Sequence, residues 1–205
     1  MVENEIQAIT FDLSAGQLSL DFANTLDDRL SASPREYLNS YHDLVSWSQQ
    51  AQTVTDSEAR LLQKEAEKHP AKASGVLQEA IVLREALFRI FSAVAEGESS
   101  EDEDLNLLNS ALSEAMCHVR IVPQTDGFQW DWTAGPENLD RVLWPVIRSA
   151  ADLLTSDELS ETRVCASEDC DWLFLDTSKN HSRRWCNMKT CGNRAKARRH
   201  YERKR

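Results

Sequence analysis

The chain has 205 residues, of which 41% are hydrophobic and 28% charged, and its formal net charge is −11. With only six Gly and five Pro, this composition is typical of an ordered globular protein and excludes a fibrous or low-complexity chain. The first residues, MVENEIQAITFDL, lack the basic start of a secretory signal, and the run of about eighteen apolar residues that a membrane helix needs occurs nowhere. We therefore expect a cytoplasmic protein with no membrane partner.

Apolar residues recur at steps of three and four along most of the chain before residue 155, which predicts a helical unit. Thr55 followed by Glu58 forms a capping box at one helix start, and Gly97 is placed to end the long helix before it. Pro145 is expected to kink the last helix or to mark an early boundary. The predicted helical segments are residues 18–26, 41–50, 57–69, 75–97, 104–116 and 137–154.

One stretch departs from helical spacing. Residues 118–132 alternate apolar and polar side chains on both sides of the turn dipeptide Asp126-Gly127, which predicts a β-hairpin. The polar residues 155–163 lack periodicity and predict a short connector. The expected architecture is mainly α with a β-hairpin, divided into a helical N-terminal domain at residues 1–158 and a small C-terminal unit at residues 159–205.

The two units carry opposite charge. Residues 163–205 contain 12 Lys and Arg against 5 Asp and Glu, net +7, whereas residues 1–162 contain 11 basic and 29 acidic residues, net −18. Four of the five cysteines also lie after residue 164. Because a reducing cytoplasm disfavours disulfides, these four favour a metal site. Cys117 stands apart from them and is expected to be a buried apolar thiol.

The four clustered cysteines form two close pairs, Cys165-x4-Cys170 and Cys186-x4-Cys191, with fifteen residues between the pairs. Two such pairs suit a tetrahedral zinc ion, and a unit of about forty residues is too small to be stable without such a metal. Because sulfur would fill all four positions, the zinc is expected to be structural. Unligated thiols and an iron–sulfur cluster are the alternatives, and His181 could replace one cysteine.

A strongly basic segment begins at Lys179, from which 11 Lys and Arg and one acidic residue extend to the C-terminus. A strand is predicted at residues 171–176, and a helix capped by Thr190 from about Cys191 onward. At about 100° per residue, two basic stripes lie on opposite sides of this helix, which suits a position between the phosphate walls of a DNA groove. A loosely binding or solubilising tail is the alternative. The stripes are Arg194, Arg198 and Arg205, and Lys196, Arg199 and Arg203.

The segment RRWCNMKTCGNRAKARR, residues 183–199, resembles the signature of the CGNR zinc-finger family, named for the tetrad formed here by Cys191, Gly192, Asn193 and Arg194. The segment LSLDFANTLDDR, residues 18–29, resembles the opening of the helical ABATE domain that precedes this finger in the family. The resemblance implies a treble-clef-like finger in which the four clustered cysteines bind zinc. It also implies a bacterial transcription regulator whose N-terminal domain senses stress or a ligand. Gly192 and Asn193 would be architectural, and Arg194 either architectural or base-reading.

Polar side chains also gather within the N-terminal motif, amid apolar residues. Because these polar side chains fall on or near one helix face, they predict either a buried hydrogen-bond network, which we favour, or the wall of a pocket for a small-molecule effector. The four side chains concerned are Asp21, Asn24, Thr25 and Arg29.

These features favour a DNA-binding transcription regulator with a sensor domain, which could act as a homodimer on two half-sites. The expected DNA contacts are Arg183, Arg184, Lys196, Arg198, Arg199 and Arg203, with Arg194 reading a base. The acidic domain could mask the finger until an effector binds. The alternative is a protein-interaction or RNA-binding module. An enzyme is not expected, because no catalytic triad motif, phosphate-binding loop or open metal site is present.

Overall fold

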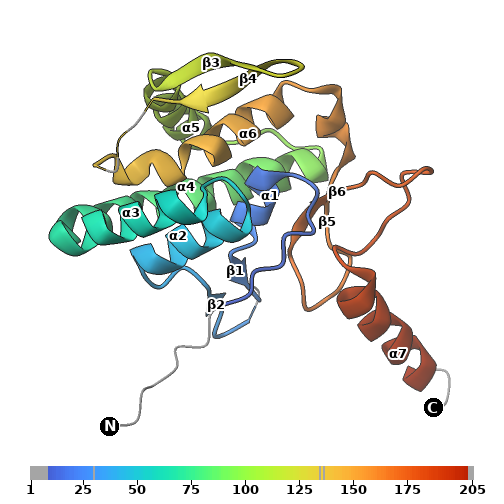
Figure 1. Ribbon diagram of the computed structural model, residues 1–205. Coiled ribbons are helices and arrows are strands. Elements are labelled where there is room, and N and C mark those ends of the chain that lie inside the picture. The colour runs from blue at the N-terminus through green and yellow to red at the C-terminus, as the bar shows by residue number, and fades with distance from the viewer. Residues whose placement is uncertain (1–8, 30, 134, 136, 203–205) are drawn as a thin grey trace, which may run out of the picture.

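The computed structural model describes residues 9–29, 31–133, 135 and 137–202 (Figure 1). Its helices are α1 (Leu18–Ala23), α2 (Tyr41–Gln50), α3 (Asp56–Lys68), α4 (Pro70–Glu96), α5 (Asp102–Met116), α6 (Trp144–Leu154) and α7 (Asn193–Glu202). Shorter helical turns are η1 (Leu139–Val142), η2 (Asp157–Glu161) and η3 (Met188–Gly192). Three antiparallel pairs of strands are β1 (Leu26–Asp27) with β2 (Arg35–Glu36), β3 (Val119–Gln124) with β4 (Gly127–Trp132), and β5 (Thr162–Val164) with β6 (Leu173–Leu175). The expected mainly helical fold with a β-hairpin is confirmed.

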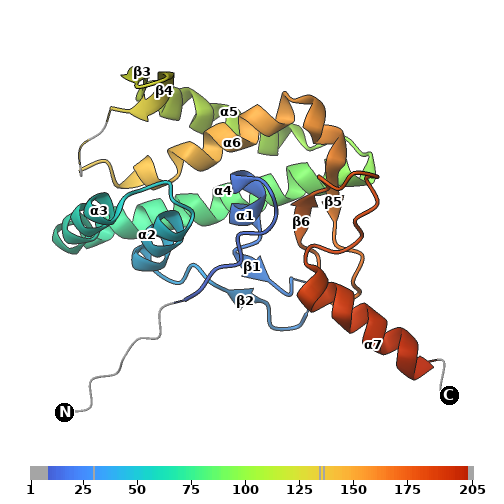
Figure 2. The same ribbon diagram turned by 45° about the vertical axis from the view of Figure 1, so that its right-hand side comes forward.

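The long helix α4 runs through the helical body, with α2 and α3 near its first half and α5 and α6 on another side (Figures 1 and 2). The short helix α1 packs against both α4 and α6, and its Leu20 and Phe22 have no exposed surface. The Phe22 ring meets that of Trp47 edge-on, with ring centroids 5.1 Å apart. This burial of aromatic and aliphatic surface is the main force that assembles the helices. Among the described residues, no helix combines the length and the apolar character that crossing a bilayer demands.

Local signals set the helix ends. The Thr55 hydroxyl accepts the Glu58 N–H while the Glu58 carboxylate accepts the Thr55 N–H, so the predicted capping box is present. Gly97 ends α4 in the left-handed conformation, with φ 75°. Pro145 lies in the first turn of α6, where it marks a helix start and causes no kink. Helix α4 begins earlier than predicted, at Pro70, because a proline in the first turn needs no partner for an amide N–H.

The predicted hairpin is formed by β3 and β4. Gln124 pairs with Gly127, so the two residues between them form the turn, which lies one residue earlier than the predicted Asp126-Gly127. Gly127 has φ 143°, a value that favours glycine, and it opens the second strand. At the other end of the hairpin, Trp132 packs on Trp144 of α6, with ring centroids 5.7 Å apart. This contact attaches the hairpin to the helical body.

A second hairpin, β5 with β6, joins the C-terminal unit to the helices. The predicted connector at residues 155–163 is partly folded, because η2 and the start of β5 lie within it. Both views show β6 beside α1, and β5 also packs on α4 (Figures 1 and 2). Leu173 and Phe174 have no exposed surface and belong to the same apolar cluster as the helical body. The hydrophobic core is therefore continuous across residue 158.

Polar contacts hold β6 in register against the N-terminal motif. The Asn24 side chain donates to the Leu173 carbonyl at 2.8 Å and accepts the Leu173 N–H at 2.9 Å. The Leu175 N–H donates to the Ala15 carbonyl at 2.7 Å. Gly16 has φ 90°, and a Cβ added there would lie 3.4 Å from the Leu175 Cβ, so the chain turns and approaches β6 closely at this residue.

We predict that Asn24→Ala lowers the free energy of unfolding by about 2–4 kcal/mol, because it leaves a buried N–H and a buried carbonyl of Leu173 without partners. Urea denaturation followed by circular dichroism measures this change. The matched control is Asn109→Ala, at an exposed position of α5, which should change the stability by less than about 0.5 kcal/mol. Equal stability of the two variants would contradict the docking role of Asn24.

Candidate metal centre

The four cysteines of the C-terminal unit lie together. Cys165 follows β5 and Cys170 lies in the loop before β6, whereas Cys186 precedes η3 and Cys191 lies within it. Their Sγ atoms all lie within 4.8 Å of one another, and all four residues are buried. The Sγ of Cys186 lies 3.7 Å from the Sγ of Cys170 and 3.7 Å from that of Cys191. The two pairs read from the sequence thus converge on one point.

These distances fit a zinc ion. Zinc bound by four sulfurs at about 2.3 Å holds them roughly 3.8 Å apart, whereas the sulfides of an iron–sulfur cluster would separate some of the cysteines more widely. Hydrogen bonds from Cys170 and Cys186 lower the pKa of Cys165 to about 2, and hydrogen bonding to Cys165 together with burial raises the pKa of Cys186. Thiolates held this close repel one another, so four of them are stable together only around a cation. The cysteines hold a structural zinc, with no coordination position left for water.

Backbone turns bring the sulfurs together. The Cys170 N–H donates to the Ser167 carbonyl at 3.1 Å, which closes the first turn. In the second turn, the Asn187 side chain accepts the Lys189 N–H at 2.9 Å. The capping residue is therefore Asn187, whereas the sequence predicted Thr190. The Gly192 N–H reaches back to the Asn187 carbonyl at 3.1 Å, which makes the turn wider than an α-helix.

Two residues of the CGNR tetrad have the expected architectural roles. A Cβ on Gly192 would lie 2.8 Å from the sulfur of Met188, so the missing side chain makes room for a methionine next to the metal centre. The Asn193 side chain donates to the Lys189 carbonyl at 3.1 Å. Both contacts stay within η3 and its junction with α7.

Two further residues singled out in the sequence, His181 and Cys117, lie outside the four-cysteine cluster. His181 is exposed, and its Nδ1 lies 2.8 Å from Glu161 Oε2, so it does not replace a cysteine. The prediction for Cys117 was wrong, because this residue is exposed. It follows α5, whose Ala115 faces the core, and its thiol donates to the Ser113 carbonyl at 3.2 Å.

Three of the predicted DNA-binding arginines have partners inside the finger. Arg183 donates to the carbonyls of Trp185 and Cys186, and its guanidinium lies 4.6 Å from the Phe174 ring centroid. Arg194 donates to the Sγ of Cys191 at 3.1 Å, and this hydrogen bond raises the pKa of Arg194. Such a donor offsets negative charge on a metal-bound sulfur.

Arg198 binds two carboxylates of the first cysteine turn, Glu168 and, at 2.6 Å, Asp169. Together with Arg194, it belongs to the stripe that was expected to meet one phosphate wall. Both described members of that stripe thus face the finger itself. The predicted arrangement of two free basic stripes is therefore reduced to one.

The remaining cations face outward. Arg184, Lys196 and Arg199 are exposed, and no ion pair joins them to a carboxylate among the residues that the structure describes. The guanidinium groups of Arg184 and Arg199 lie 5.6 and 5.8 Å from the ring centroid of Trp185, which is half-buried between them. Arg203 and Arg205 lie outside the described residues. The candidate nucleic-acid face consists of these three cations and Trp185.

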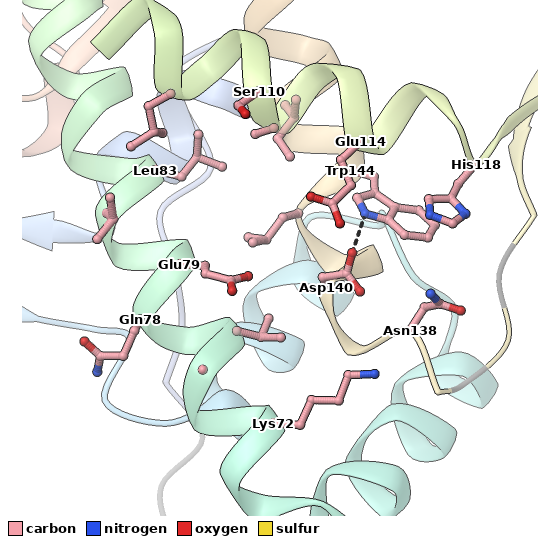
Figure 3. Close-up of a pocket in the computed structure, with 17 residues that line it drawn as sticks. Lys72, Gln78, Glu79, Leu83, Ser110, Glu114, His118, Asn138, Asp140 and Trp144 are labelled. Atoms are coloured by element: carbon pink, nitrogen blue, oxygen red, sulfur yellow. Dashed lines mark hydrogen bonds between the residues drawn. The ribbon is translucent and has the colours of Figure 1, made fainter. Parts of the chain in front are cut away.

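The four polar residues of the N-terminal motif were predicted to form a network or a pocket. A cavity of about 840 Å³ between α4, α5 and α6 is lined by none of them (Figure 3). Asp21, Asn24 and Thr25 line a smaller cavity of about 70 Å³, well below the ~300 Å³ typical of a site for a small organic ligand. Aromatic side chains, among them Tyr37 and Trp172, form much of the rest of its wall, and its volume is enough only for water-sized molecules.

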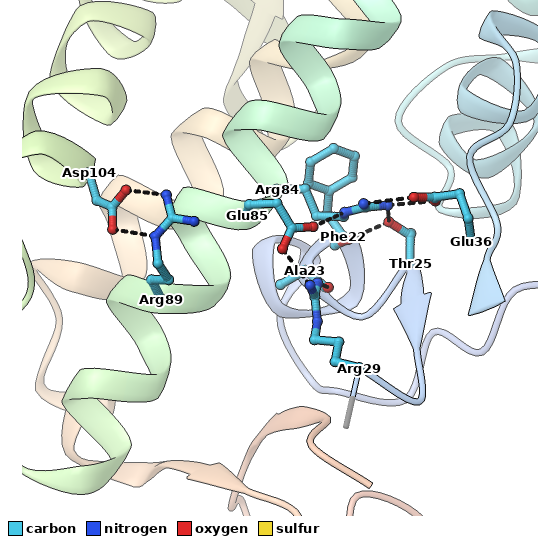
Figure 4. A network of polar contacts seen from close by, with 9 residues as sticks. All are labelled: Phe22, Ala23, Thr25, Arg29, Glu36, Arg84, Glu85, Arg89 and Asp104. Carbon is cyan, nitrogen blue, oxygen red and sulfur yellow. Dashed lines mark hydrogen bonds and ion pairs between the residues drawn. The ribbon is translucent and has the colours of Figure 1, made fainter. Parts of the chain in front are cut away.

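The residues of this motif instead take part in buried polar contacts. The Arg29 guanidinium pairs with Glu85 at 2.5 Å, donates to the Ala23 carbonyl at 2.8 Å and lies 4.1 Å from the Phe88 ring centroid (Figure 4). The Thr25 hydroxyl donates to the Phe22 carbonyl at 2.8 Å. The favoured network interpretation therefore agrees with the contacts of these side chains.

The centre of this network is Arg84, which sequence analysis missed. Its side chain is 2% exposed, and its two amino groups meet the Glu36 carboxylate of β2 at 2.6 and 2.8 Å, while its Nε lies 2.9 Å from Glu85 (Figure 4). A guanidinium buried so deeply requires such bidentate pairing. The sequence signal is a lone arginine on an otherwise apolar face of the long helix.

Folding changes the protonation of Asp21 more than that of any other residue of this motif. Its Oδ1 accepts the Ala15 N–H at 2.9 Å, but burial dominates and raises the pKa of Asp21 to about 7. The folded protein therefore binds a proton at this carboxyl between about pH 4 and pH 7 that the unfolded chain releases. The contribution of Asp21 to stability consequently falls as the pH rises through this window.

We predict that purified protein contains one zinc per chain and one rapidly reacting thiol, the exposed Cys117, with four more thiols reacting only after chelation. A zinc assay and thiol titration measure both. Cys186→Ser should lose the metal and unfold the finger, whereas Cys117→Ser should retain one zinc and no fast thiol. Full metal content in Cys186→Ser would exclude four-cysteine ligation.

We predict that Asp21→Asn removes a pH dependence from the stability. Between pH 5 and pH 8, the stability of the variant relative to the wild type should rise by about 2–3 kcal/mol, because only the wild type must bury a carboxylate at high pH. Urea denaturation at several pH values, with zinc in excess, measures the difference. A difference that stays constant with pH would show that Asp21 has an ordinary pKa.

Comparison with known families agrees with this geometry. Residues 16–157 match the model of the ABATE family, described as a putative stress-induced transcription regulator. Residues 162–204 match the CGNR zinc finger, which contains the four clustered cysteines. No curated protein sequence matches the chain. The chain belongs to the ABATE family and has a CGNR zinc finger at its C-terminal end.

Proposed function

We propose that the protein is a DNA-binding transcription regulator in which the zinc finger contacts DNA and the helical body senses an effector. The observation that carries this proposal is the position of α7. In both views this helix points away from the helical body, so its outer side is open to a large partner (Figures 1 and 2). Acidic residues of the helical body that could mask it, as the charge asymmetry suggested, do not pair with Arg184, Lys196 or Arg199 in the described part of the chain.

Duplex DNA suits the chemistry of this face. These three exposed cations are free to neutralise phosphates. Lys196 and Arg199 are positioned because η3 joins α7 to the metal centre, and Arg184 is positioned because its carbonyl accepts the Ala166 N–H at 2.8 Å beside Cys165. Arg194 and Arg198 support the face by holding α7 against the cysteine turns. To contact a base, Arg194 would have to break its hydrogen bond to Cys191. We therefore propose that the three outward cations provide the affinity for DNA.

So few phosphate contacts give modest affinity. Each neutralised phosphate contributes about 0.9 to the slope of log affinity against log salt, so three contacts predict a slope near about −2.7 per finger. A homodimer that places two fingers on two half-sites would double the number of contacts. Dimerisation is therefore part of the proposed mode of action.

The metal itself supports a binding role over catalysis. Four sulfurs fill the coordination sphere of the zinc, so it has no position at which to activate water. We therefore propose a regulator and not an enzyme.

We predict that the double variant Lys196→Gln, Arg199→Gln reduces the salt slope of DNA binding by roughly 1.8 per finger, because two phosphate contacts are lost. Fluorescence anisotropy with a labelled duplex of random sequence, over a series of salt concentrations, measures the slope. The matched control is Arg60→Gln, Lys64→Gln on α3, which removes the same charge at exposed positions far along the chain. Equal slopes for the two double variants would exclude α7 as the contact.

Competition separates DNA binding from the alternative function. If unlabelled single-stranded RNA displaces the protein from duplex DNA at much lower concentration than the duplex itself, Trp185 and its flanking arginines act as a stacking surface for RNA. If neither nucleic acid binds while zinc remains bound, the finger is a protein-interaction module.

A further inference from the structure

The cavity of about 840 Å³ is built by three helices of the helical body (Figure 3). Its floor is apolar and consists of side chains that belong to the core, among them Val76, Leu83, Leu143 and Ile147, each 5% exposed or less. A cavity of this size lies within the range of sites for small organic ligands, about 300–1,000 Å³. An apolar floor of this kind binds the hydrophobic part of a ligand.

The rim of the cavity carries excess negative charge. The carboxylates of Glu79 on α4 and Glu114 on α5 approach from opposite sides, and that of Asp140 on η1 closes a third side (Figure 3). Neither Glu79 nor Glu114 forms an ion pair or a side-chain hydrogen bond among the residues that the structure describes. One lining cation, Lys72, donates to the Glu137 carbonyl at 2.6 Å. The carboxylates of Glu79 and Glu114 therefore have no cationic side chain paired with them in the described part of the chain.

The third carboxylate fixes an aromatic wall. Asp140 accepts the Trp144 indole N–H at 2.9 Å, and the His118 ring stacks on Trp144 with centroids 4.3 Å apart and an interplanar angle of 3°. Trp144 is 2% exposed, so it serves as a rigid support, and the partly exposed His118 ring stacked on it is the aromatic surface that a ligand would meet. Rigid aromatic and acidic groups next to each other favour a positively charged ligand with a hydrophobic body.

A glycine inside α4 lines this cavity. Gly75 lies inside α4, where glycine costs about 0.5–1 kcal/mol relative to alanine. A Cβ added there would meet no atom within 4 Å, so packing against neighbouring residues does not require the glycine. Gly75 nevertheless lines the cavity, and a larger side chain at this position would project into open space there. The missing side chain leaves this part of the cavity unfilled.

We propose that this cavity binds an organic cation with an apolar or aromatic body, with Glu79 and Glu114 meeting the positive charge. Binding itself does not depend on the proposed DNA-binding function. Its meaning as the effector site of the regulator does rest on that function.

The test uses two xanthene dyes of opposite charge, the cation rhodamine 6G and the anion fluorescein, added to the full-length zinc-loaded protein. Fluorescence anisotropy should show saturable binding of one rhodamine 6G per chain and no saturable binding of fluorescein. Since no DNA is present, the result is independent of whether the finger binds DNA. Equal affinity for the two dyes would overturn the proposed selectivity.

Variants locate the site. Glu79→Gln, Glu114→Gln should weaken rhodamine 6G binding by roughly three- to thirtyfold, the range for two exposed ion pairs. The matched control Glu98→Gln, Glu101→Gln removes the same charge at exposed positions outside the cavity, and screening at physiological salt should limit its effect to less than about twofold. Equal effects of the two double variants would mean that the dye follows the overall negative charge of the protein, which would overturn the proposal.

A second pair of variants tests access. Gly75→Leu should place a bulky side chain in the cavity and weaken dye binding by about tenfold, whereas Gly75→Ala should keep the dye affinity and raise the thermal stability. Both substitutions lie in α4 at a position with open space around it, so both variants should fold. Unchanged dye binding by a folded Gly75→Leu would place the dye outside this cavity.

Discussion

The convergence of four sulfurs within 4.8 Å is the constraint on which the C-terminal unit of the structure depends. Between β6 and η3, residues 176–187 form no regular helix or strand, so backbone ladders do not hold this loop. The loop is fixed at its two ends, by the metal and by Asp176, whose carboxylate accepts the N–H groups of Ser178 and Arg183 at 2.9 and 2.8 Å. Without the ion, α7 would be attached to the first cysteine turn mainly by the exposed ion pairs of Arg198 with Glu168 and Asp169, which are weak compared with metal ligation.

The same unit is tied to the helical body by contacts of a different kind. Asn24 imitates a strand edge by offering one donor and one acceptor to Leu173, and the apolar side chains of β6 continue the core of the helices. Helix α4 connects two regions of the protein, since it lines the large cavity and also packs on β5 of the second hairpin. A ligand that moved α4 would therefore act on the hairpin that orients the finger. This mechanical connection exists whatever the bound partner of the finger is.

Sequence alone predicted the features that depend on local chemistry. The capping box at Thr55, the hairpin over residues 118–132 and the two cysteine pairs each need only neighbouring residues, and all are present, although the hairpin turn lies one residue before the predicted Asp126-Gly127. Features that depend on distant residues were missed. Strand β5 exists only because β6 pairs with it. Arg198 was expected to bind phosphate, but it pairs with two carboxylates that lie 29 and 30 positions earlier in the chain. The large cavity arises from the packing of three helices, which no short motif encodes.

The hydrophobic core is continuous across residue 158, so zinc binding in the finger affects the stability of the whole chain. An ion bound only by the folded state stabilises that state by about 1.4 kcal/mol for each tenfold excess of free zinc over its dissociation constant. Because the finger and the helices share apolar surface, this free energy resists opening of the helical body as well. Proteases in the cell act on opened chains, so turnover of the protein would slow when zinc is plentiful and quicken under zinc starvation.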